Sequence, residues 1–271
     1  MKIGNREIGV VLSALARKRH YVAARNMLRV YRHPVDAFGR YFLGRGQYPA
    51  DIRINTVSGP LILTVYSYHD ILTVNEIFCR LDYRAKEGDR VIVDFGSNIG
   101  ISAAYFLTST PNSFVYLFEP LPLNIDRLRN NLRPFESRYA LQGIAVGQAD
   151  GEVEFGWEHT GRYGGIGMKT GRYIPVPCRD SNSILEGIIA RNDRIDILKI
   201  DIETLERQVT ERIPIDIARK IDRIYVECSF HSNPLEHTHS YRQYGTVAQF
   251  VNKEANPFAP HERTSRPGLP W

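Results

Sequence analysis

The sequence predicts an α/β protein built around a doubly wound, mostly parallel β-sheet. From residue 91 onward, short apolar runs rich in β-branched residues alternate with amphipathic segments, which is the order expected of parallel strands joined by helices. The 271 residues suffice for one large domain with a buried core. The composition, 43% hydrophobic and 24% charged, is typical of a globular chain and excludes a disordered or collagenous one.

Residues 1–85 are predicted to form an N-terminal helical cap and a β-hairpin. Apolar residues recur at helical spacing from Ile8, and Pro34 marks the end of that pattern. A Ser-Gly-Pro turn separates two later apolar runs. The expected elements are a helix over residues 8–31, a hairpin with strands 52–56 and 61–66, and a helix over residues 70–80.

Residues 86–256 are predicted to form the sheet domain, and residues 257–271 a Pro-rich tail that is extended or poorly ordered. The insert at residues 153–179 is rich in Gly, Tyr and Arg, and such an insert is expected to be functional or to form its own hairpin. The expected strands are 91–93, 114–118, 139–146, 195–200 and 223–228, and the expected helices are 100–109, 123–132 and 241–252.

The basic character of the chain is confined to its N-terminus. Residues 1–55 contain 11 Lys and Arg against 3 Asp and Glu, whereas the remaining residues contain 24 against 27. A basic groove along the whole protein, as a general nucleic-acid-binding protein needs, is therefore not predicted. The basic segment instead predicts a peripheral contact with a membrane surface or with an anionic acceptor. A homo-oligomer is also compatible with the sequence.

Cysteine usage and hydropathy favour a cytoplasmic protein. Cys79, Cys178 and Cys228 are odd in number and widely spaced, which indicates neither a disulfide framework nor a zinc site. No apolar stretch reaches the roughly 18 residues of a membrane-spanning helix. The apolar run 8–16 imitates a secretion signal, but Glu7 before it and three basic residues after it favour an amphipathic helix.

A cofactor site is predicted where two successive strands end. In VIVDFGSNIG, Asp94 ends a strand and two glycines follow, so that a ligand can approach the backbone and the N-terminus of a helix. Asp94 would repel a pyrophosphate but favours the cationic groups of S-adenosyl-L-methionine. After the next strand, Glu119 is placed to accept the ribose hydroxyl hydrogens. The predicted cofactor-binding residues are Asp94, Gly96, Ser97, Asn98, Gly100, Glu119, Pro120 and Ala145.

These motifs resemble those of the FkbM family of S-adenosylmethionine-dependent methyltransferases. The resemblance covers residues 41–231 and rests on VIVDFGSNIG, on FEP followed by Asn124 and Asn131, on IAVGQADGEVEF and on IDILKIDIETLE. It implies a Rossmann-like class I methyltransferase fold. It also implies O-methylation of a hydroxyl on a sugar, glycolipid or other natural product.

The chain departs from the family pattern at three places. Thr204 stands after the KxDxE acid, where members commonly have Gly, so the turn there is expected to differ. Asp-Ser-Asn-Ser at residues 180–183 replaces a common Leu-Asp pair. The usual last β-hairpin of the sheet is not visible after Cys228, which puts the far edge of the sheet in doubt.

Methyl transfer to a hydroxyl requires alignment of the reacting atoms and removal of a proton. Asp201 follows the strand 195–200 at the edge where open α/β sheets bind ligands. It is the first candidate for the reaction centre, where it would either orient the methionine part of the cofactor or accept the substrate proton, with a helix N-cap as the alternative. Glu227 and His231 follow the next strand and are further catalytic candidates. Asp201 and Glu227 are also candidate Mg²⁺ ligands, although their spacing is not specific for a metal.

The acceptor is predicted to contact the insert. His159, Arg162 and Tyr163 lie among flexible glycines, which suits an acceptor-binding loop or lid, the alternative being a solvent-exposed turn. Lys199 is a further substrate-binding candidate, either paired with the acidic residues or simply a strand-end lysine. Before the glycine motif, Tyr66, His69 and Asp70 are candidates for a contact with the cofactor from the cap.

Two other function classes compete with a methyltransferase of a small-molecule or glycosylated acceptor. The first is a non-catalytic binding module that keeps the cofactor fold and uses the basic N-terminus for a partner or a membrane surface. The second is a nucleic-acid methyltransferase, which predicts an NPPY or DPPY motif after the fourth strand. KIDIETLE stands there, so a nucleic-acid partner is not predicted.

Overall fold

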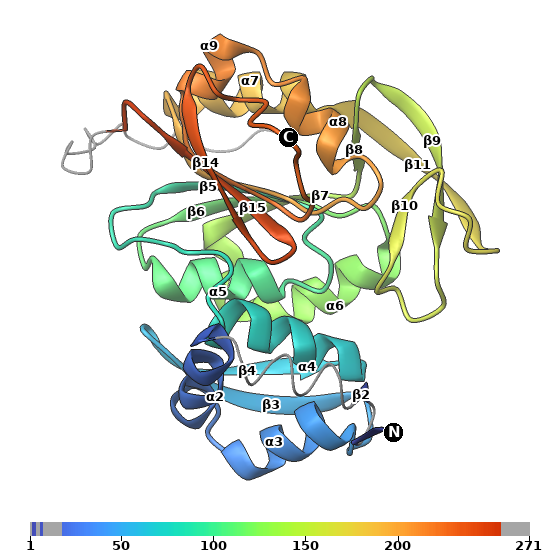
Figure 1. Cartoon of the computed structure of the whole chain (residues 1–271). Helices are drawn as coiled ribbons and strands as arrows, with labels where there is room; N and C mark the ends of the chain where they lie inside the picture. The colour runs from blue at the N-terminus through green and yellow to red at the C-terminus, as the bar shows by residue number, and fades with distance from the viewer. Residues whose placement is uncertain (1, 4–5, 8–17, 256–271) are drawn as a thin grey trace.

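The computed structural model describes residues 2–3, 6–7 and 18–255, and it shows a layered α/β arrangement (Figure 1). A seven-stranded sheet with the order β14-β15-β13-β12-β5-β6-β7 lies at the centre. Helices α5 and α6 lie on one side of this sheet and α7, α8 and α9 on the other (Figure 1). The predicted fold class is therefore confirmed. The elements are β5 (Val91–Phe95), α5 (Ile101–Ser109), β6 (Phe114–Phe118), α6 (Pro122–Leu132), β7 (Tyr139–Gln142), α7 (Ser181–Asn192), β12 (Ile195–Ile200), α8 (Glu206–Glu211), α9 (Ile215–Arg219) and β13 (Ile221–Val226).

The strand order places a crevice at the end of β5. Strands β6 and β12 pair with β5 on opposite sides, and both are parallel to it. The chain therefore reverses its winding direction at β5, and the carboxyl ends of the strands next to such a reversal form a ligand-binding crevice. Ile92 and Val93, neighbours in β5, pack into different hydrophobic clusters. Both faces of the strand are thus covered, which explains its unbroken apolar sequence.

The far edge of the sheet corrects two expectations. Residues expected to form a helix over 241–252 form most of a β-hairpin, and the hairpin expected to be missing is present. Its strands are β14 (His239–Tyr244) and β15 (Val247–Asn252), joined through Gly245 at φ 66°. Strand β15 lies between β13 and β14 and is antiparallel to both. Ala248, Phe250 and Asn252 are buried whereas Gln249 and Val251 are half-buried, so burial alternates along this part of β15. The hydropathy does not follow this alternation, because Val251 is apolar and Asn252 is polar, and the sequence therefore lacks a clear strand signal.

The N-terminal segment packs on α5 and α6 (Figure 1). The predicted hairpin is confirmed, and the predicted first helix is confirmed over α2, whereas residues 8–17 lie outside the described residues. Met27 and Ile54 of this segment share one hydrophobic cluster with Phe106 of α5, so the core is continuous between the cap and the sheet domain. The elements are β1 (Lys2–Ile3), β2 (Arg6–Glu7), α2 (Lys18–Val30), α3 (Pro34–Leu43), β3 (Ala50–Thr56), β4 (Gly59–Val65), α4 (Tyr68–Val74) and the π-helical turn η1 (Asn75–Cys79).

Asn131 on α6 joins the cap to the glycine motif. Its Nδ2 donates to the carbonyl oxygens of Thr64 and Ile99 at 3.2 and 2.9 Å, and its Oδ1 accepts from the Thr64 N–H at 2.8 Å. One buried amide therefore fixes strand β4 against the loop that follows β5.

The insert forms a small second sheet with the order β10-β9-β11-β8, which confirms the expected hairpin. The expected strand 139–146 is instead two strands, β7 and β8, in different sheets, because the chain turns away at Gly143 and Ile144. The turn after β12 contacts this sheet, since Thr204 Oγ1 donates to the Ile166 carbonyl oxygen at 3.0 Å. The remaining elements are η2 (Arg133–Arg138), β8 (Ala145–Gly147), β9 (Gly151–Trp157), β10 (Gly164–Ile166) and β11 (Tyr173–Asp180).

Other expectations concern cysteines, membranes and the termini. Cys79, Cys178 and Cys228 are free thiols, as predicted. Within residues 18–255, no helix combines the length and apolar character required to cross a membrane. The proposed tail at 257–271 and the signal-like run at 8–16 lie outside the described residues.

Candidate active site

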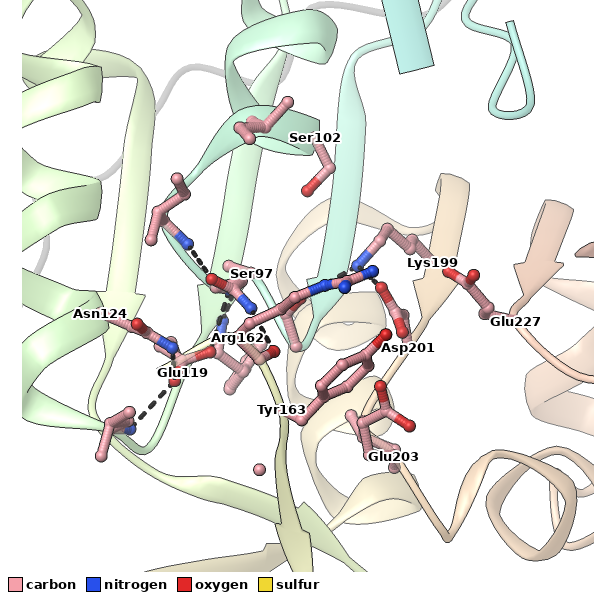
Figure 2. A pocket seen from close by; sticks show the side chains of 18 of the residues that line it. Ser97, Ser102, Glu119, Asn124, Arg162, Tyr163, Lys199, Asp201, Glu203 and Glu227 are labelled. Carbon is pink, nitrogen blue, oxygen red and sulfur yellow. Dashed lines mark hydrogen bonds and ion pairs between the residues drawn. The ribbon is translucent and has the colours of Figure 1, made fainter. Parts of the chain in front are cut away.

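One cavity at the carboxyl ends of β5, β6 and β12 brings together most of the predicted site residues. In Figure 2, Glu119 and Asn124 lie on one side and Lys199, Asp201 and Glu227 on the other, with Arg162 and Tyr163 between them. Of the residues predicted from sequence, those that line the cavity are Gly96, Ser97, Asn98, Glu119, Pro120, Ala145, Arg162, Tyr163, Lys199, Asp201 and Glu227; those that do not are Asp94, Gly100, His159 and His231.

Gly96 forms part of the cavity floor, where no other residue fits. Its φ is 79°, a conformation that favours glycine. A Cβ atom at this position would lie 1.8 Å from the Asp201 carbonyl oxygen. The close approach of the two strand ends therefore requires glycine. Gly100 also has a positive φ, 84°, but it caps α5 against Leu128 and Leu132 instead of facing the cavity.

Glu119 presents a buried carboxylate to the cavity. Its Oε2 accepts from the Asn98 N–H at 2.9 Å, and its Oε1 accepts from the Leu121 N–H at 3.0 Å and from Asn124 Nδ2 at 3.2 Å. Burial raises the pKa of Glu119 to about 7, although these hydrogen bonds lower it. A carboxylate offers about four acceptor positions. Glu119 can therefore accept a further hydrogen bond from a ligand hydroxyl.

Asp94 is not among the residues that line the cavity, and its expected contact with the cofactor stays a prediction. It is fully buried, and it receives Lys199 Nζ at 2.9 Å and Ser102 Oγ at 2.5 Å. Lys199 is its direct cross-strand neighbour on β12, so the lysine rather than a ligand neutralises Asp94. Burial alone would lower the pKa of Lys199, but Asp94 and Asp201 raise it above its usual value.

Asp201 and Glu227 form a carboxyl pair at the other end of the cavity. Lys199 Nζ lies 3.3 Å from Asp201 Oδ2, which confirms the predicted pairing of this lysine with the acidic residues. The charge of Asp201, together with burial, raises the pKa of Glu227 to about 8. Glu227 also accepts a hydrogen bond from the Tyr83 hydroxyl at 3.1 Å. At neutral pH, Glu227 therefore largely retains its proton.

Other acidic side chains gather at this end of the cavity. Burial, Asp201 and Glu206 raise the pKa of Glu203 to about 7. Burial likewise raises the pKa of Glu76, which reaches the cavity from η1. Sequence reasoning missed Glu76, Tyr83 and Glu203. Only Glu203 carried a signal, because it belongs to the KIDIE motif.

Loop 158–164, which joins β9 to β10 and includes the first residue of β10, covers the cavity. The Arg162 guanidinium carbon lies 4.3 Å from the centre of the Tyr163 ring. Three side chains hold the backbone of this loop: Asn98 Nδ2 donates to the Arg162 carbonyl oxygen at 3.1 Å, Asn124 Nδ2 to Gly161 at 2.7 Å, and Arg127 Nη1 to Thr160 at 2.6 Å. The loop is thus anchored over the cavity, while His159 points to solvent.

Comparison with known proteins identifies the family. A model of the methyltransferase FkbM domain matches residues 94–254. The chain belongs to the FkbM methyltransferase domain family. The resemblance inferred from the motifs is therefore confirmed.

Two curated proteins show shorter similarities to this FkbM domain. The AMB antimetabolite synthetase AmbE of Pseudomonas aeruginosa is 34% identical over 92 residues, which are 34% of this chain and 4% of that protein. The 2-O-methyltransferase NoeI of Sinorhizobium fredii is 36% identical over 67 residues, which are 25% of this chain and 27% of that protein. The matches thus cover small parts of both relatives.

Solved structures of methyltransferases are similar to this FkbM family member at low sequence identity. A methyltransferase FkbM from Methylobacillus flagellatus is 16% identical, with a TM-score of 0.39, over 68% of this chain and 54% of that chain. A methyltransferase from Geobacter sulfurreducens is 13% identical, with a TM-score of 0.38, over 68% and 89%.

The departures from the FkbM pattern have local explanations. Thr204 has φ 76° and follows Glu203 at φ 50°, so the turn keeps a left-handed conformation without glycine. At the second departure, the Asp180 side chain accepts from the N–H groups of Asn182 and Ser183, both at 3.0 Å, and caps α7. The Asp-Ser-Asn-Ser segment therefore begins helix α7.

Several candidate residues of the FkbM domain and its cap are exposed or are engaged in other contacts. His231 is exposed. Asp70 lines the cavity, but its carboxylate accepts from the N–H groups of Tyr66 and Ser67 at 2.6 and 2.9 Å and caps α4. His69 is exposed, and the Tyr66 ring lies against Arg127. Asp201 is not a helix cap, since α8 begins five residues later at Glu206 after Leu205.

Proposed function

We propose that this FkbM domain is an S-adenosylmethionine-dependent O-methyltransferase that transfers a methyl group in line to a hydroxyl of a sugar, glycolipid or other natural product. The observation that carries the proposal is a single cavity lined by the Gly96 floor, the Glu119 carboxylate and the Asp201–Glu227 pair. The three free thiols support the predicted cytoplasmic location, because cytosolic proteins keep their cysteines reduced.

The residues in the cavity suit S-adenosylmethionine. Gly96 lines the cavity without a side chain, and Glu119 has remaining capacity to accept a ribose hydroxyl hydrogen. Ile144, Ala145 and Val146 supply an apolar wall for a base. The acidic side chains favour a cation on the opposite side. When bound, the cofactor supplies an electrophilic methyl group.

Asp201 is the residue we assign to removal of the acceptor proton. The ammonium of Lys199, 3.3 Å away, stabilises negative charge on its carboxylate. Glu227 is poorly suited to accept a proton at neutral pH because its pKa is raised to about 8. Asp201 would accept the O–H proton as the methyl group passes from the cofactor sulfur, which keeps the electron pair of the broken carbon–sulfur bond, to the acceptor oxygen. A positioned base of this kind contributes roughly 10²- to 10⁴-fold to the rate.

Loop 158–164 is the proposed acceptor contact. The Tyr163 ring offers an apolar face against which a sugar can pack, and Arg162 supplies several hydrogen-bond donors. The similarity to a 2-O-methyltransferase supports a hydroxyl as the acceptor group.

Calorimetry with S-adenosylmethionine and S-adenosylhomocysteine tests the cofactor assignment, and absence of binding by both would overturn it. Incubation of a panel of glycosides and glycolipids with labelled cofactor, followed by mass spectrometry, identifies the acceptor. A parallel incubation with EDTA tests the predicted Mg²⁺ at Asp201 and Glu227. Within the described residues, no group of three or more His, Cys, Asp or Glu side chains suits a metal ion.

Asp201→Asn separates catalysis from binding. We expect the turnover rate to fall roughly 10²- to 10⁴-fold while the cofactor dissociation constant changes little. Asp216→Asn, at an exposed position on α9, is the matched control. Full activity of Asp201→Asn would exclude Asp201 as the base. Cofactor binding without methylation of any acceptor class would favour the non-catalytic binding module.

A further inference from the structure

The hydrogen bonds of Asn98 and Asn124 connect the two parts of the cavity that we assign to the cofactor and to the acceptor. Asn98 donates its backbone N–H to Glu119 and its Nδ2 to the carbonyl oxygen of Arg162. Asn124 donates from one Nδ2 to both Glu119 and the carbonyl oxygen of Gly161. Each asparagine therefore contacts the Glu119 carboxylate on one side and loop 158–164 on the other.

The surroundings fix the orientation of the Asn124 amide. Its two neighbours, the Glu119 carboxylate and the Gly161 carbonyl, are both acceptors, so the NH₂ group must face them. The Oδ1 atom points away, is buried and has no hydrogen-bond partner among the described residues. Gly161 packs closely over this oxygen, since a Cβ there would lie 2.6 Å from it. The loop and the amide thus fit against one another in one arrangement.

We propose that Asn98 and Asn124 are positioning residues that transmit occupancy of the Glu119 site to loop 158–164, so that cofactor binding sets Arg162 and Tyr163 for the acceptor. This inference rests on the proposed function. Binding of the cofactor before the acceptor follows from it.

The physical basis is the acceptor that both asparagines share. Glu119 accepts from the Asn98 N–H and from Asn124 Nδ2, and the side chains of the same two residues hold the carbonyl oxygens of Arg162 and Gly161. Burial raises the pKa of Glu119, whereas a ligand hydroxyl that donates to it favours the ionised carboxylate. Hydrogen bonds to an ionised carboxylate are roughly twice as strong as neutral ones, so the bonds from the Asn98 N–H and from the Asn124 amide strengthen together. The Asn124 amide and the backbone at Asn98 are then held more firmly, and so is the loop backbone that these residues contact.

Hydrogen exchange measured on peptides covering residues 158–164 tests this coupling without requiring activity. In the wild-type protein, saturating S-adenosylhomocysteine is expected to slow exchange in the loop by about tenfold. In Asn124→Ala, saturating ligand no longer slows it, and the dissociation constant measured by calorimetry rises about 3- to 10-fold. Asn130→Ala is the matched control, because Asn130 lies on the same helix but donates to the exposed Thr64 hydroxyl.

Arg127→Ala distinguishes coupling from simple anchoring. Arg127 holds the Thr160 carbonyl oxygen but does not contact Glu119. We expect its loss to speed loop exchange in the free protein, while ligand still slows exchange and the dissociation constant stays within about twofold of the wild-type value. If Asn124→Ala does not fold, Asn98→Gly serves instead, since it keeps the backbone donor to Glu119 and removes the side-chain bond to Arg162, together with the local bond from the Ile99 N–H.

The outcomes separate this inference from the proposed function. Unchanged ligand protection of the loop in Asn124→Ala, or in Asn98→Gly where that variant replaces it, overturns the coupling alone. Ligand binding that does not protect the loop in the wild-type protein also overturns the coupling alone. Failure of the wild-type protein to bind either cofactor form overturns both proposals.

Discussion

Gly96 and Gly171 share one backbone angle, φ 79°, but differ in their surroundings. A Cβ at Gly96 meets the Asp201 carbonyl oxygen at 1.8 Å, whereas a Cβ at Gly171 meets nothing within 4 Å. The pair therefore separates the strain of a left-handed residue from the steric demand of the cavity floor.

Replacement of each glycine by alanine measures that difference. Gly171→Ala is expected to lose about 1–2 kcal/mol of unfolding free energy through backbone strain. Gly96→Ala is expected to lose about 2–5 kcal/mol, because two backbone segments must also move apart. Urea denaturation gives both values, and equal losses would contradict the steric argument. Calorimetry should in addition show weaker cofactor binding in Gly96→Ala only.

Glu227 makes the stability of the protein depend on pH. The ordinary pKa of a glutamate is 4.5, and the neighbouring Asp201 raises that of Glu227 to about 8 in the folded state. Between these values the folded state binds more protons than the unfolded state, so stability falls as pH rises. Above pH 8 the full repulsion between the two carboxylates is present.

Glu227→Gln is expected to raise the melting temperature at pH 8.5 and to change it much less at pH 5.5. Glutamine keeps the size of the side chain and removes its charge. Thermal unfolding at the two pH values provides the measurement. Glu236→Gln, an exposed position, serves as the control and should show no such difference. A gain that is equal at both pH values would show that charge repulsion from Asp201 is not its cause.

The sequence could identify some site residues but not their partners. Gly96, Glu119 and Asp201 were predictable because short motifs place them at the ends of successive strands. The role of Asp94 was not, because it depends on the register that sets Lys199 beside it in β12. Tyr83 gave no signal, since it meets Glu227 across 144 residues of chain.

At the scale of elements, the turn after β12 determines where Asp201 and Glu203 point. Glu203 and Thr204 both adopt positive φ, 50° and 76°, and threonine is β-branched. A β-branched residue in this region is strained, by about 1–3 kcal/mol. Packing of the insert onto the turn holds it in place through the bond from Thr204 to Ile166.

Thr204→Gly is expected to relieve this strain. The gain offsets the lost hydrogen bond and the greater freedom of glycine in the unfolded chain, so stability should lie within about 1 kcal/mol of the wild-type value or above it. Thr56 is the matched control: its hydroxyl also donates to a backbone carbonyl, that of Gly59, but its φ is not positive. Thr56→Gly should lose about 1–2 kcal/mol in urea denaturation. Equal losses in both variants would count against strain at Thr204.

The predictable elements were those whose apolar residues form an unbroken or nearly unbroken run. The strands at 91–93 and 114–118 are apolar throughout, and the strand at 195–200 is apolar except at Asp196 and Lys199, because helices cover both faces of the sheet. The hairpin β14–β15 was missed because the hydropathy of β15 does not follow its burial: Val251 is apolar but half-buried, and Asn252 is polar but buried. The split between β7 and β8 also escaped prediction, because nothing local marks that consecutive strands belong to different sheets.

At the scale of the whole molecule, one exposed face of α2 combines positive charge with apolar side chains. Arg25 and Arg29 are exposed along this face, together with Val22 and Leu28, whose side chains are 50% and 61% exposed. All four fall within one side of a helix with 3.6 residues per turn. This composition suits the predicted contact with an anionic membrane surface.

A double variant, Arg25→Glu with Arg29→Glu, tests that contact. Because each arginine near an anionic surface contributes about 1 kcal/mol, affinity for vesicles containing phosphatidylserine should fall at least about 30-fold. Lys169→Glu with Arg219→Glu makes the same change in net charge at exposed positions outside the cap. Cosedimentation with phosphatidylserine-containing and phosphatidylcholine-only vesicles is the measurement. An equal loss of vesicle affinity in both double variants would contradict a specific contact through α2 and would indicate a non-specific effect of net charge.

The Asn131 bridge and the shared cluster of Met27, Ile54 and Phe106 have a consequence for folding. Contacts between residues 64 and 131 and between β3 and α5 join parts of the chain that are far apart in sequence. The cap and the sheet domain are therefore expected to unfold in a single cooperative transition rather than in two steps. The glycine motif, which Asn131 holds through Ile99, acquires its shape only when both parts have folded.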